Sequence, residues 1–271
     1  MNRLLYLTLL LIIPAFSFAA RVDTITIPST AMRASFKCVV VTPDRYKKSK
    51  QRYPVIYLLH GYSGNHGDWI KKVPVIKILA DRDSVIFVCP DGGFGSWYLD
   101  SPIDSTMRYE TFVGREIPAY IDAHYRSIPD RAHRAIAGLS MGGHGALFLA
   151  IRHQDIFGAA GSMSGGVDIR PFPKNWELAK RLGDSATHAA NWDKYTVVNV
   201  ASQLKDGDLK LIIDCGVKDF FIHVNRNLHA VLLKNGITHD YTERPGAHNW
   251  DYWSNAIVYQ ETFFKRFFSG L

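Results

Sequence analysis

The segment 136–146, with the sequence IAGLSMGGHGA, constrains the fold of this chain most, because it holds the pattern Gly-x-Ser-x-Gly around Ser140. This pattern is typical of a sharp turn between a strand and a helix that leaves the serine hydroxyl exposed. The glycines two residues before and after the serine have a physical reason. A side chain there would collide with the neighbouring strand or helix while the serine is held at strained backbone angles. Residues 133–137 favour a short buried strand and residues 142–151 favour a helix of small residues, which is the setting that the pattern requires.

Strand-like and helix-like segments alternate along most of the chain, which predicts a mostly parallel sheet covered by helices on both faces. The run Val-Ile-Tyr-Leu-Leu at 55–59 has the unbroken apolar character of a central strand. We expect further strands at 84–89, 133–137, 157–163, 209–213 and 238–243, after an antiparallel pair at 22–28 and 33–42. We expect helices at 75–81, 107–125 with Pro118 as a kink or local break, 142–151, 221–234 and 252–268. Residues 165–207, with two prolines and two tryptophans, interrupt the alternation, and we interpret them as a cap-like insertion in one domain.

The first twenty residues differ from the rest in composition. Arg3 precedes an apolar run from Leu4 to Phe16, and the overlapping small-residue sites SFA and FAA follow it. This arrangement is typical of a secretory signal peptide, and it is too short and wrongly flanked for a membrane-spanning helix. No other run reaches 18 apolar residues. We therefore expect residues 1–20 to be removed and the single domain 21–271 to be secreted or periplasmic, without a membrane span.

The charge pattern argues against a nucleic-acid-binding function, and the cysteine pattern argues against a disulfide framework. The net charge is +7, but the basic residues are scattered, and no zinc-finger, RNP or basic-helix signature indicates a nucleic-acid partner. One basic cluster at 45–52 is read as a solvated loop in preference to a site for an acidic partner. Each cysteine lies in or beside an apolar run, so we interpret Cys38, Cys89 and Cys215 as buried small hydrophobic residues, although one pair could bridge in an oxidising compartment.

A serine hydroxyl becomes a good nucleophile only when a base removes its proton and an acid orients that base. The histidines downstream of the serine are His144, His153, His188, His223, His229, His239 and His248. Two of them lie in the predicted helix after the serine, where they would face its surface or pack against a neighbour. His248 instead lies between the last predicted strand and the last helix. This is the carboxyl edge of the sheet, where ligands bind in open α/β folds, so we expect His248 to be the base.

Two aspartates near the end of the preceding strand are candidates for the acid. Asp214 ends the strand, and Asp219 lies five residues further on, just before a helix that it could also cap. Reach favours Asp219, because its side chain must extend toward a histidine that leaves the neighbouring strand. Asp214 would then hold the loop in place.

The transition state of acyl transfer carries an oxyanion that needs backbone N–H donors arranged in advance. Met141 follows the serine at a helix N-terminus and supplies one donor. The glycine-rich loop that begins at His60 supplies the other, most simply through the N–H of Tyr62. His60, His66 and Asp68 could instead suggest metal ligands, but no recognised ligand pair such as H-E-x-x-H is present, so we expect no metal and no cofactor.

Five segments in this order resemble the esterase D superfamily of α/β-hydrolases: LLHGYSG at 58–64, SWYLD at 96–100, GLSMGG at 138–143, GVKDF at 216–220 and GAHNW at 246–250. This group includes S-formylglutathione hydrolases, feruloyl and acetylxylan esterases, short-chain acyl esterases and mycolyltransferases. The resemblance, which runs from about residue 33 to 268, implies an α/β-hydrolase fold, the triad Ser140, Asp219 and His248, and an oxyanion hole from Tyr62 and Met141. It strengthens the choice of Asp219, whereas residues 165–207 match nothing in the group.

An exported serine carboxylesterase that works through an acyl-enzyme is therefore the leading hypothesis. The expected substrates are small or polysaccharide-linked esters, either carbohydrate-linked feruloyl or acetyl esters or short-chain esters. Of five aromatic residues that could stack on a feruloyl or sugar ring, namely Trp97, Tyr98, Trp192, Trp250 and Trp253, we expect about two to contact substrate, with Trp97, Tyr98 and Trp250 as the named candidates. The alternatives are an acyltransferase or a serine peptidase with the same triad, or a non-catalytic carbohydrate-binding relative.

Overall fold

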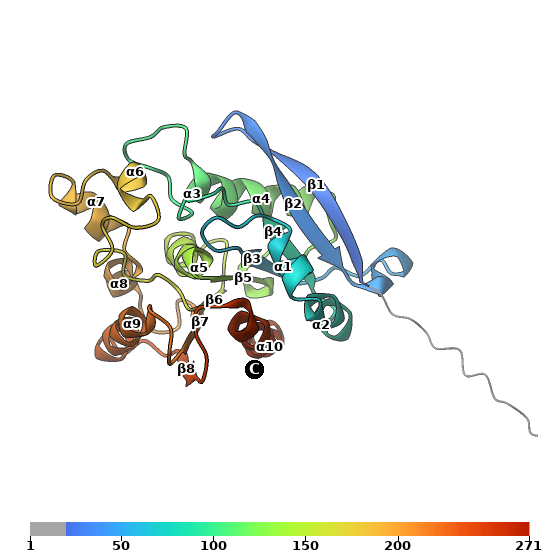
Figure 1. The fold of residues 1–271 in the computed structure, drawn as a ribbon. Helices are drawn as coiled ribbons and strands as arrows, with labels where there is room; N and C mark the ends of the chain where they lie inside the picture. Colours follow the sequence, from blue (N-terminus) through green and yellow to red (C-terminus); the bar gives the residue numbers. More distant parts are fainter. Residues whose placement is uncertain (1–19, 271) are drawn as a thin grey trace, which may run out of the picture.

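Five consecutive apolar residues form the centre of the sheet, and all five are buried. The computed structural model describes residues 20–270 (Figure 1). Its strands are β1 (Arg21–Ser29), β2 (Ala34–Thr42), β3 (Val55–Leu59), β4 (Ile86–Pro90), β5 (Arg134–Leu139), β6 (Ala159–Met163), β7 (Lys210–Gly216) and β8 (Asp240–Arg244). They form one sheet with the order β1-β2-β4-β3-β5-β6-β7-β8. The pairs β1–β2 and β2–β4 are antiparallel, whereas every other neighbouring pair is parallel, which confirms the predicted sheet.

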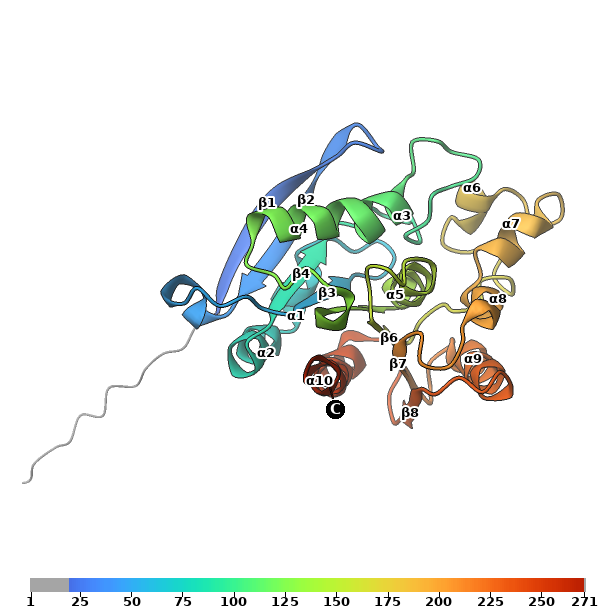
Figure 2. The same ribbon diagram turned by 180° about the vertical axis from the view of Figure 1, so that it is seen from behind.

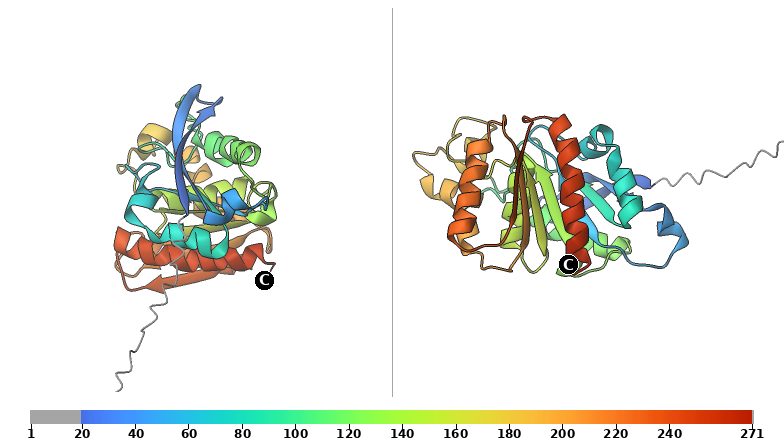
Figure 3. Two further views of the ribbon diagram at one scale, coloured as in Figure 1. Left: turned by 90° about the vertical axis from the view of Figure 1, so that its right-hand side faces the viewer. Right: turned by 90° about the horizontal axis from the view of Figure 1, so that it is seen from below.

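Helices cover both faces of this sheet, as Figures 2 and 3 show. They are α1 (Asp68–Lys72), α2 (Val75–Asp83), α3 (Tyr109–Thr111), α4 (Ile117–His124), α5 (Met141–Arg152), α6 (Leu178–Leu182), α7 (Ala189–Lys194), α8 (Val197–Val200), α9 (Ile222–Lys234) and α10 (Trp250–Phe268), with short 3₁₀ helices at Asp44–Lys48, Arg131–His133 and Ala201–Gln203. Side chains of α4, α5 and α9 pack with Tyr57 on one face. Side chains of α1, α2 and α10 pack with Ile56 on the other, as the alternation of side chains along a strand requires.

The helical run predicted at 107–125 is present but changes its hydrogen bonding part of the way along. A π-helical turn at Phe112–Glu116 separates α3 from α4, and Pro118 lies in the first turn of α4. Proline has no N–H and cannot donate to the carbonyl four residues earlier, so a local break is expected just before it. The structure places the break there.

Residues 165–207 contribute helices α6, α7 and α8 and no strand, in a segment that the structure describes throughout. In Figure 1 they lie beyond α5 at the side of the sheet. Trp192 and Val197 of this segment are buried in the same core cluster as α5 and α9. The segment is therefore packed onto the domain.

The predicted signal peptide falls almost wholly on residues 1–19, which lie outside the described residues. Between residues 20 and 270 no helix combines the length and apolar character needed to cross a membrane. Cys38, Cys89 and Cys215 are unpaired and buried, which confirms their interpretation as small hydrophobic residues. Burial raises the pKa of all three thiols.

Candidate active site

Ser140 lies between β5 and α5 in a strained turn, with φ 55° and ψ −117°. A positive φ is rare for a residue with a side chain and is found where the surrounding structure enforces it. A Cβ atom at Gly138 would lie 2.3 Å from the carbonyl oxygen of Gly142. A Cβ atom at Gly142 would lie 2.5 Å from the carbonyl oxygen of Leu59 on β3. These contacts confirm that both glycines of the pattern are needed for close backbone approach.

The structure brings Ser140, His248 and Asp219 together in one chain of hydrogen bonds. His248 Nε2 lies 2.9 Å from Ser140 Oγ. His248 Nδ1 lies 2.8 Å and 3.0 Å from the two carboxylate oxygens of Asp219. Because a carboxylate accepts hydrogen bonds, this contact favours the tautomer with the proton on Nδ1 and leaves Nε2 free to accept the serine proton.

Each of these three side chains follows the carboxyl end of a parallel strand: β5, β7 and β8. Asp219 is buried, and its Oδ1 also accepts the N–H of Phe221 at 2.8 Å, so it both contacts His248 and closes the turn that leads into α9. The ring of Phe220 lies 4.2 Å from that of His248, and the ring of Trp253 meets the imidazole edge-on at 4.9 Å. These rings hold the imidazole in place between the serine and the carboxylate.

Asp214, the other candidate for the acid, has different partners. Its carboxylate accepts hydrogen bonds from Tyr252 at the start of α10 and from Arg244 at the end of β8. Burial raises the pKa of this carboxyl, while both partners act in the opposite direction. Asp214 thus ties β7, β8 and α10 together at the base of the loop that carries His248.

The two predicted oxyanion donors come from two separate segments that meet at the serine. Met141 is the first residue of α5, and Tyr62 belongs to the loop after β3, which touches the serine turn. A Cβ at Gly61 would lie 3.4 Å from Ser140 Cβ. Neither the Tyr62 nor the Met141 N–H has an acceptor among residues 20–270. Both donors are therefore available to an oxyanion at the serine.

His60 fixes the orientation of the loop that carries Tyr62. Its Nδ1 lies 2.8 Å from the carbonyl oxygen of Gly61, to which it donates, and its Nε2 accepts the N–H of Gly92 at 2.8 Å. Burial lowers the pKa of His60, so the ring is neutral and makes both bonds. Because a trans peptide is planar, a Gly61 carbonyl turned toward His60 points the Tyr62 N–H the opposite way. With both ring nitrogens engaged, His60 is not available as a metal ligand, and no cluster of three metal-ligating side chains occurs in the described chain.

The serine opens into a pocket of about 290 Å³. Its aromatic lining residues come from four parts of the chain: Tyr62, Trp176, Phe220, Trp250 and Trp253. Lys72 of α1 also lines it, with its ammonium group 4.7 Å from the centre of the Trp250 ring. Of the five aromatic residues considered from the sequence, Trp250 and Trp253 thus reach the pocket.

Trp97 and Tyr98, which we expected to contact substrate, do not line the pocket. Both side chains are fully buried, in a segment where both residues have a positive φ, 54° for Trp97 and 59° for Tyr98. The indole of Trp97 donates to the carbonyl of Trp176, and the hydroxyl of Tyr98 donates to the carbonyl of His60. They support the pocket from behind, and Trp192 is likewise buried.

Sequence reasoning missed Trp176 and Phe220 as pocket residues. Phe220 directly follows Asp219 in the sequence, so its position beside the predicted acid could have marked it as a pocket residue. Trp176 lies in the insertion, where no motif marks it. The two rings stack with centroids 5.8 Å apart and an interplanar angle of 19°.

The side chains of His144 and His153, which lie in α5 and directly after it, make no hydrogen bond to the serine. His144 is buried, and its Nε2 donates to the carbonyl of Tyr195 at 2.9 Å. Burial lowers the pKa of His144 to about 4, so the ring is neutral. His153 is buried next to Glu110, with Nε2 3.3 Å from the carboxylate. From the sequence, we expected each of these two histidines either to face the helix surface or to pack against a neighbour, and both pack against neighbours.

Comparison with known proteins agrees with this arrangement. A family model described as "Putative esterase" matches residues 29–264. An acetyl esterase of Caldicellulosiruptor saccharolyticus is 29% identical over 215 residues, which cover 75% of this chain and 80% of that protein. Diacylglycerol acyltransferase/mycolyltransferase Ag85A of Mycobacterium gordonae is 25% identical over 272 residues, covering 87% of this chain and 78% of that protein.

Among solved structures, a ferulic acid esterase is 30% identical and superimposes with a TM-score of 0.80, over 93% of this chain and 99% of its own. The family model, the acetyl esterase and this structure all point to hydrolysis of carboxylic esters on an α/β-hydrolase fold. The chain belongs to this esterase family and is a carboxylic ester hydrolase.

Proposed function

We propose that this protein is an exported serine esterase that hydrolyses carbohydrate-linked acyl esters through an acyl-enzyme on Ser140. The hydrogen-bonded chain from Ser140 through His248 to Asp219 carries the proposal. His248 Nε2 lies 2.9 Å from Ser140 Oγ, and the Asp219 carboxylate lies 2.8 Å from His248 Nδ1, which supports the roles of nucleophile, base and orienting acid for these residues. Nucleophilic ester hydrolysis requires these roles in this order.

Acylation begins when Ser140 Oγ attacks the ester carbonyl carbon and His248 Nε2 takes the hydroxyl proton. The N–H groups of Tyr62 and Met141 bind the resulting oxyanion, and Asp219 stabilises the imidazolium. The intermediate collapses as His248 returns the proton to the leaving alcohol oxygen and the C–O bond breaks. In deacylation His248 takes a proton from water, the hydroxide oxygen attacks the acyl carbon, and the acid leaves as Ser140 regains its proton.

The shape of the pocket supports a small or flat acyl group. A volume of about 290 Å³ is at the lower end of the range for ligand cavities, which runs from roughly 300 to 1,000 Å³. Exposed rings lie beside it: Phe220 is 53% exposed, and Phe94, also exposed, packs edge-on against Tyr62. Such rings suit the flat face of a sugar or of a feruloyl group. Two relatives named for acetyl and ferulic acid ester hydrolysis support the same substrate class.

The proposed export rests on the leader-like residues 1–20 of the sequence. An esterase that works outside the cytoplasm meets polysaccharide-linked esters. This location argues against S-formylglutathione as the natural substrate.

Ser140→Ala tests the nucleophile. We expect the variant to remain folded and to lose hydrolysis of p-nitrophenyl acetate and methyl ferulate, together with covalent labelling by a fluorophosphonate probe. Ser202→Ala is a matched control, because Ser202 is an exposed serine whose hydroxyl donates to the carbonyl of Asn199. Full activity or full labelling of the Ser140→Ala variant would refute the proposal. A screen of acetylated and feruloylated oligosaccharides against short-chain p-nitrophenyl esters then ranks the substrates.

Similarity to mycolyltransferase Ag85A favours acyl transfer as the second candidate function. In that case the hydroxyl of a second substrate would replace water in deacylation, with the same groups at the serine. Adding a sugar acceptor to the ester assay distinguishes the two reactions. Transfer appears as an acylated sugar formed at the expense of free acid.

A further inference from the structure

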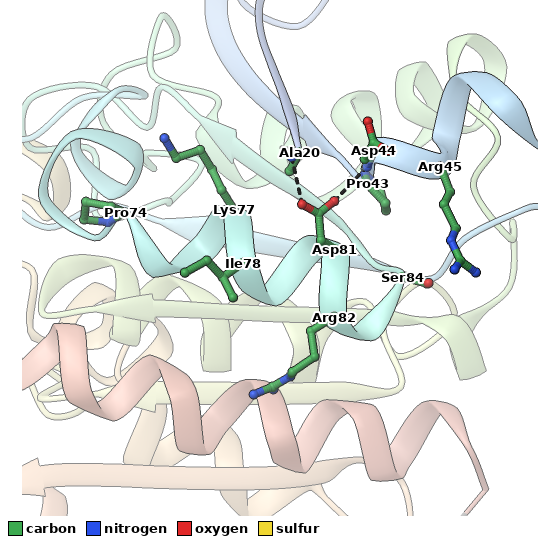
Figure 4. Close-up of a pocket in the computed structure, with 10 residues that line it drawn as sticks. All are labelled: Ala20, Pro43, Asp44, Arg45, Pro74, Lys77, Ile78, Asp81, Arg82 and Ser84. Atoms are coloured by element: carbon green, nitrogen blue, oxygen red, sulfur yellow. Dashed lines mark hydrogen bonds between the residues drawn. The ribbon is translucent and has the colours of Figure 1, made fainter. Parts of the chain in front are cut away.

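A second cavity, of about 680 Å³, shares no lining residue with the serine pocket and lies where the described chain begins (Figure 4). In its wall Asp81 of α2 accepts two backbone hydrogen bonds. Its Oδ2 accepts the N–H of Ala20 at 2.9 Å, and its Oδ1 accepts the N–H of Asp44 at 2.7 Å. One half-buried carboxylate therefore holds the residue directly before β1 and the second residue after β2.

The charge of Asp81 has no cationic partner within 4 Å among the described residues. Lys77 lies one turn earlier on α2 and lines the same cavity, but it makes no ion pair with Asp81. Asp44, whose N–H binds Asp81, has a cationic partner of its own, because its carboxylate lies 3.1 Å from the ammonium group of Lys48. A half-buried carboxylate gains most from a donor that also carries a positive charge.

The leader-like sequence contains two overlapping cleavage sites that differ by one residue, and the structure distinguishes them. Cleavage after Ala20 would remove a side chain that belongs to the core cluster with α2 and α10, as well as the N–H that binds Asp81. It would also place the large Phe18 at the third position before the cut, where small residues are usual. Cleavage after Ala19 keeps Ala20 and places Ser17 and Ala19 at the two small-residue positions.

We infer that the leader is cut between Ala19 and Ala20 and that the new α-ammonium group of Ala20 forms an ion pair with Asp81. Hydrolysis of that peptide bond leaves a carboxylate on Ala19 and an ammonium group on the nitrogen that already lies 2.9 Å from Asp81. Processing thus supplies the missing positive charge without moving the chain. The pair fastens the edge strand β1 to α2, and it rests on the proposed export but not on the catalytic proposal.

The first test is the N-terminal sequence of the exported protein, obtained by expressing the full 271-residue chain in a bacterium and purifying it from the periplasm or medium. We expect it to begin at Ala20. A chain that begins at residue 21 or later, or that retains residues before 20, would overturn the inference.

The second test isolates the charge. Chains that begin at Ala20 are compared with a free and with an acetylated N-terminus, since acetylation keeps the N–H and removes the charge. We expect acetylation to lower the melting temperature by about 2–4 °C, the shift for about 1 kcal/mol in a domain of this size. In an Asp81→Asn background acetylation should change nothing. Equal melting temperatures of the free and acetylated wild-type chains would overturn the ion pair. Hydrolysis of p-nitrophenyl acetate should be the same in all four proteins, so failure here leaves the triad proposal untouched.

Discussion

The strongest test of the proposed oxyanion hole is a pair of substitutions at His60, a side chain that contacts neither the serine nor the pocket. Its two ring nitrogens make different hydrogen bonds: Nδ1 donates to the Gly61 carbonyl, and Nε2 accepts the Gly92 N–H. Asparagine places an amide nitrogen near the position of Nδ1 but is too short to reach Gly92. Glutamine places an amide oxygen near the position of Nε2 but does not hold Gly61. The pair therefore separates the two bonds.

The two variants should differ in what they lose: the glutamine variant loses activity, and the asparagine variant loses stability. In His60→Gln the Gly61 carbonyl keeps only the backbone N–H of Gly64, at 3.1 Å, so the peptide between Gly61 and Tyr62 loses its side-chain support and the Tyr62 N–H is held less firmly toward the oxyanion. Loss of one such donor lowers kcat about 10²–10³-fold, or about 3–4 kcal/mol, and changes KM little because the donor acts mainly in the transition state. In His60→Asn the donor stays in place. This variant instead leaves the buried Gly92 N–H without an acceptor, which costs about 1–3 kcal/mol of the free energy of unfolding.

The assay is steady-state hydrolysis of p-nitrophenyl acetate at a temperature where both variants are folded by circular dichroism, with urea unfolding measured in parallel. We expect the glutamine variant to hydrolyse the ester slowly and the asparagine variant to be active, with the asparagine variant the less stable of the two. Equal kcat values for the two folded variants would show that the Gly61 carbonyl bond does not position the donor.

Three further predictions address the rest of the site and the fold. Asp219→Asn should lower kcat about 10⁴-fold, because an amide does not hold His248 in the tautomer that accepts the serine proton; Asp214→Asn should instead lower the urea midpoint and leave kcat within a few fold. Gly142→Ala should abolish folding or cost more than about 3 kcal/mol of the free energy of unfolding, since its Cβ would lie 2.5 Å from the carbonyl oxygen of Leu59. Gly207→Ala is the control: no atom lies within 4 Å of the added Cβ, so the substitution should cost only about 1–2 kcal/mol for its positive φ. Burial and the neighbouring Asp83 raise the pKa of Glu261 to about 8 from 4.5, so the folded protein keeps a proton that the unfolded chain releases. Stability should fall as the pH rises from about 4.5 to 8, and Glu261→Gln should remove that fall in urea titrations at pH 5 and 9.

Much of the fold and of the candidate site could be predicted from the sequence, because the signals are local. Apolar runs marked the parallel strands, and the residues proposed for chemistry lie in short segments directly after β3, β5, β7 and β8. Since parallel strands end at the same edge of a sheet, a correct order of strands and loops was enough to place Asp219 and His248 beside Ser140.

The walls of the pocket could not be predicted in the same way. Trp97 and Tyr98 face the core in a segment with two successive positive φ values, and such values at tryptophan and tyrosine are uncommon in any sequence. The position of Trp176 depends on how the whole 165–207 segment packs against α5 and α9. Tertiary packing determines the positions of all three side chains, and no periodic pattern in the sequence predicts that packing.

The sheet edge and the 165–207 insertion differ in how tightly the backbone constrains them, and this difference bears on substrate specificity. The proposed nucleophile, base, acid and donors are held by backbone contacts at the sheet edge, where Gly138 and Gly142 leave no room for change. The pocket lining, by contrast, includes Trp176 from the insertion and Phe220 from a loop, and Phe220 is 53% exposed. Substitutions in these two places alter the shape offered to the acyl or sugar group without moving the serine. We therefore expect substitutions at Trp176 and Phe220 to alter substrate choice while leaving the hydrogen bonds from Ser140 through His248 to Asp219 intact.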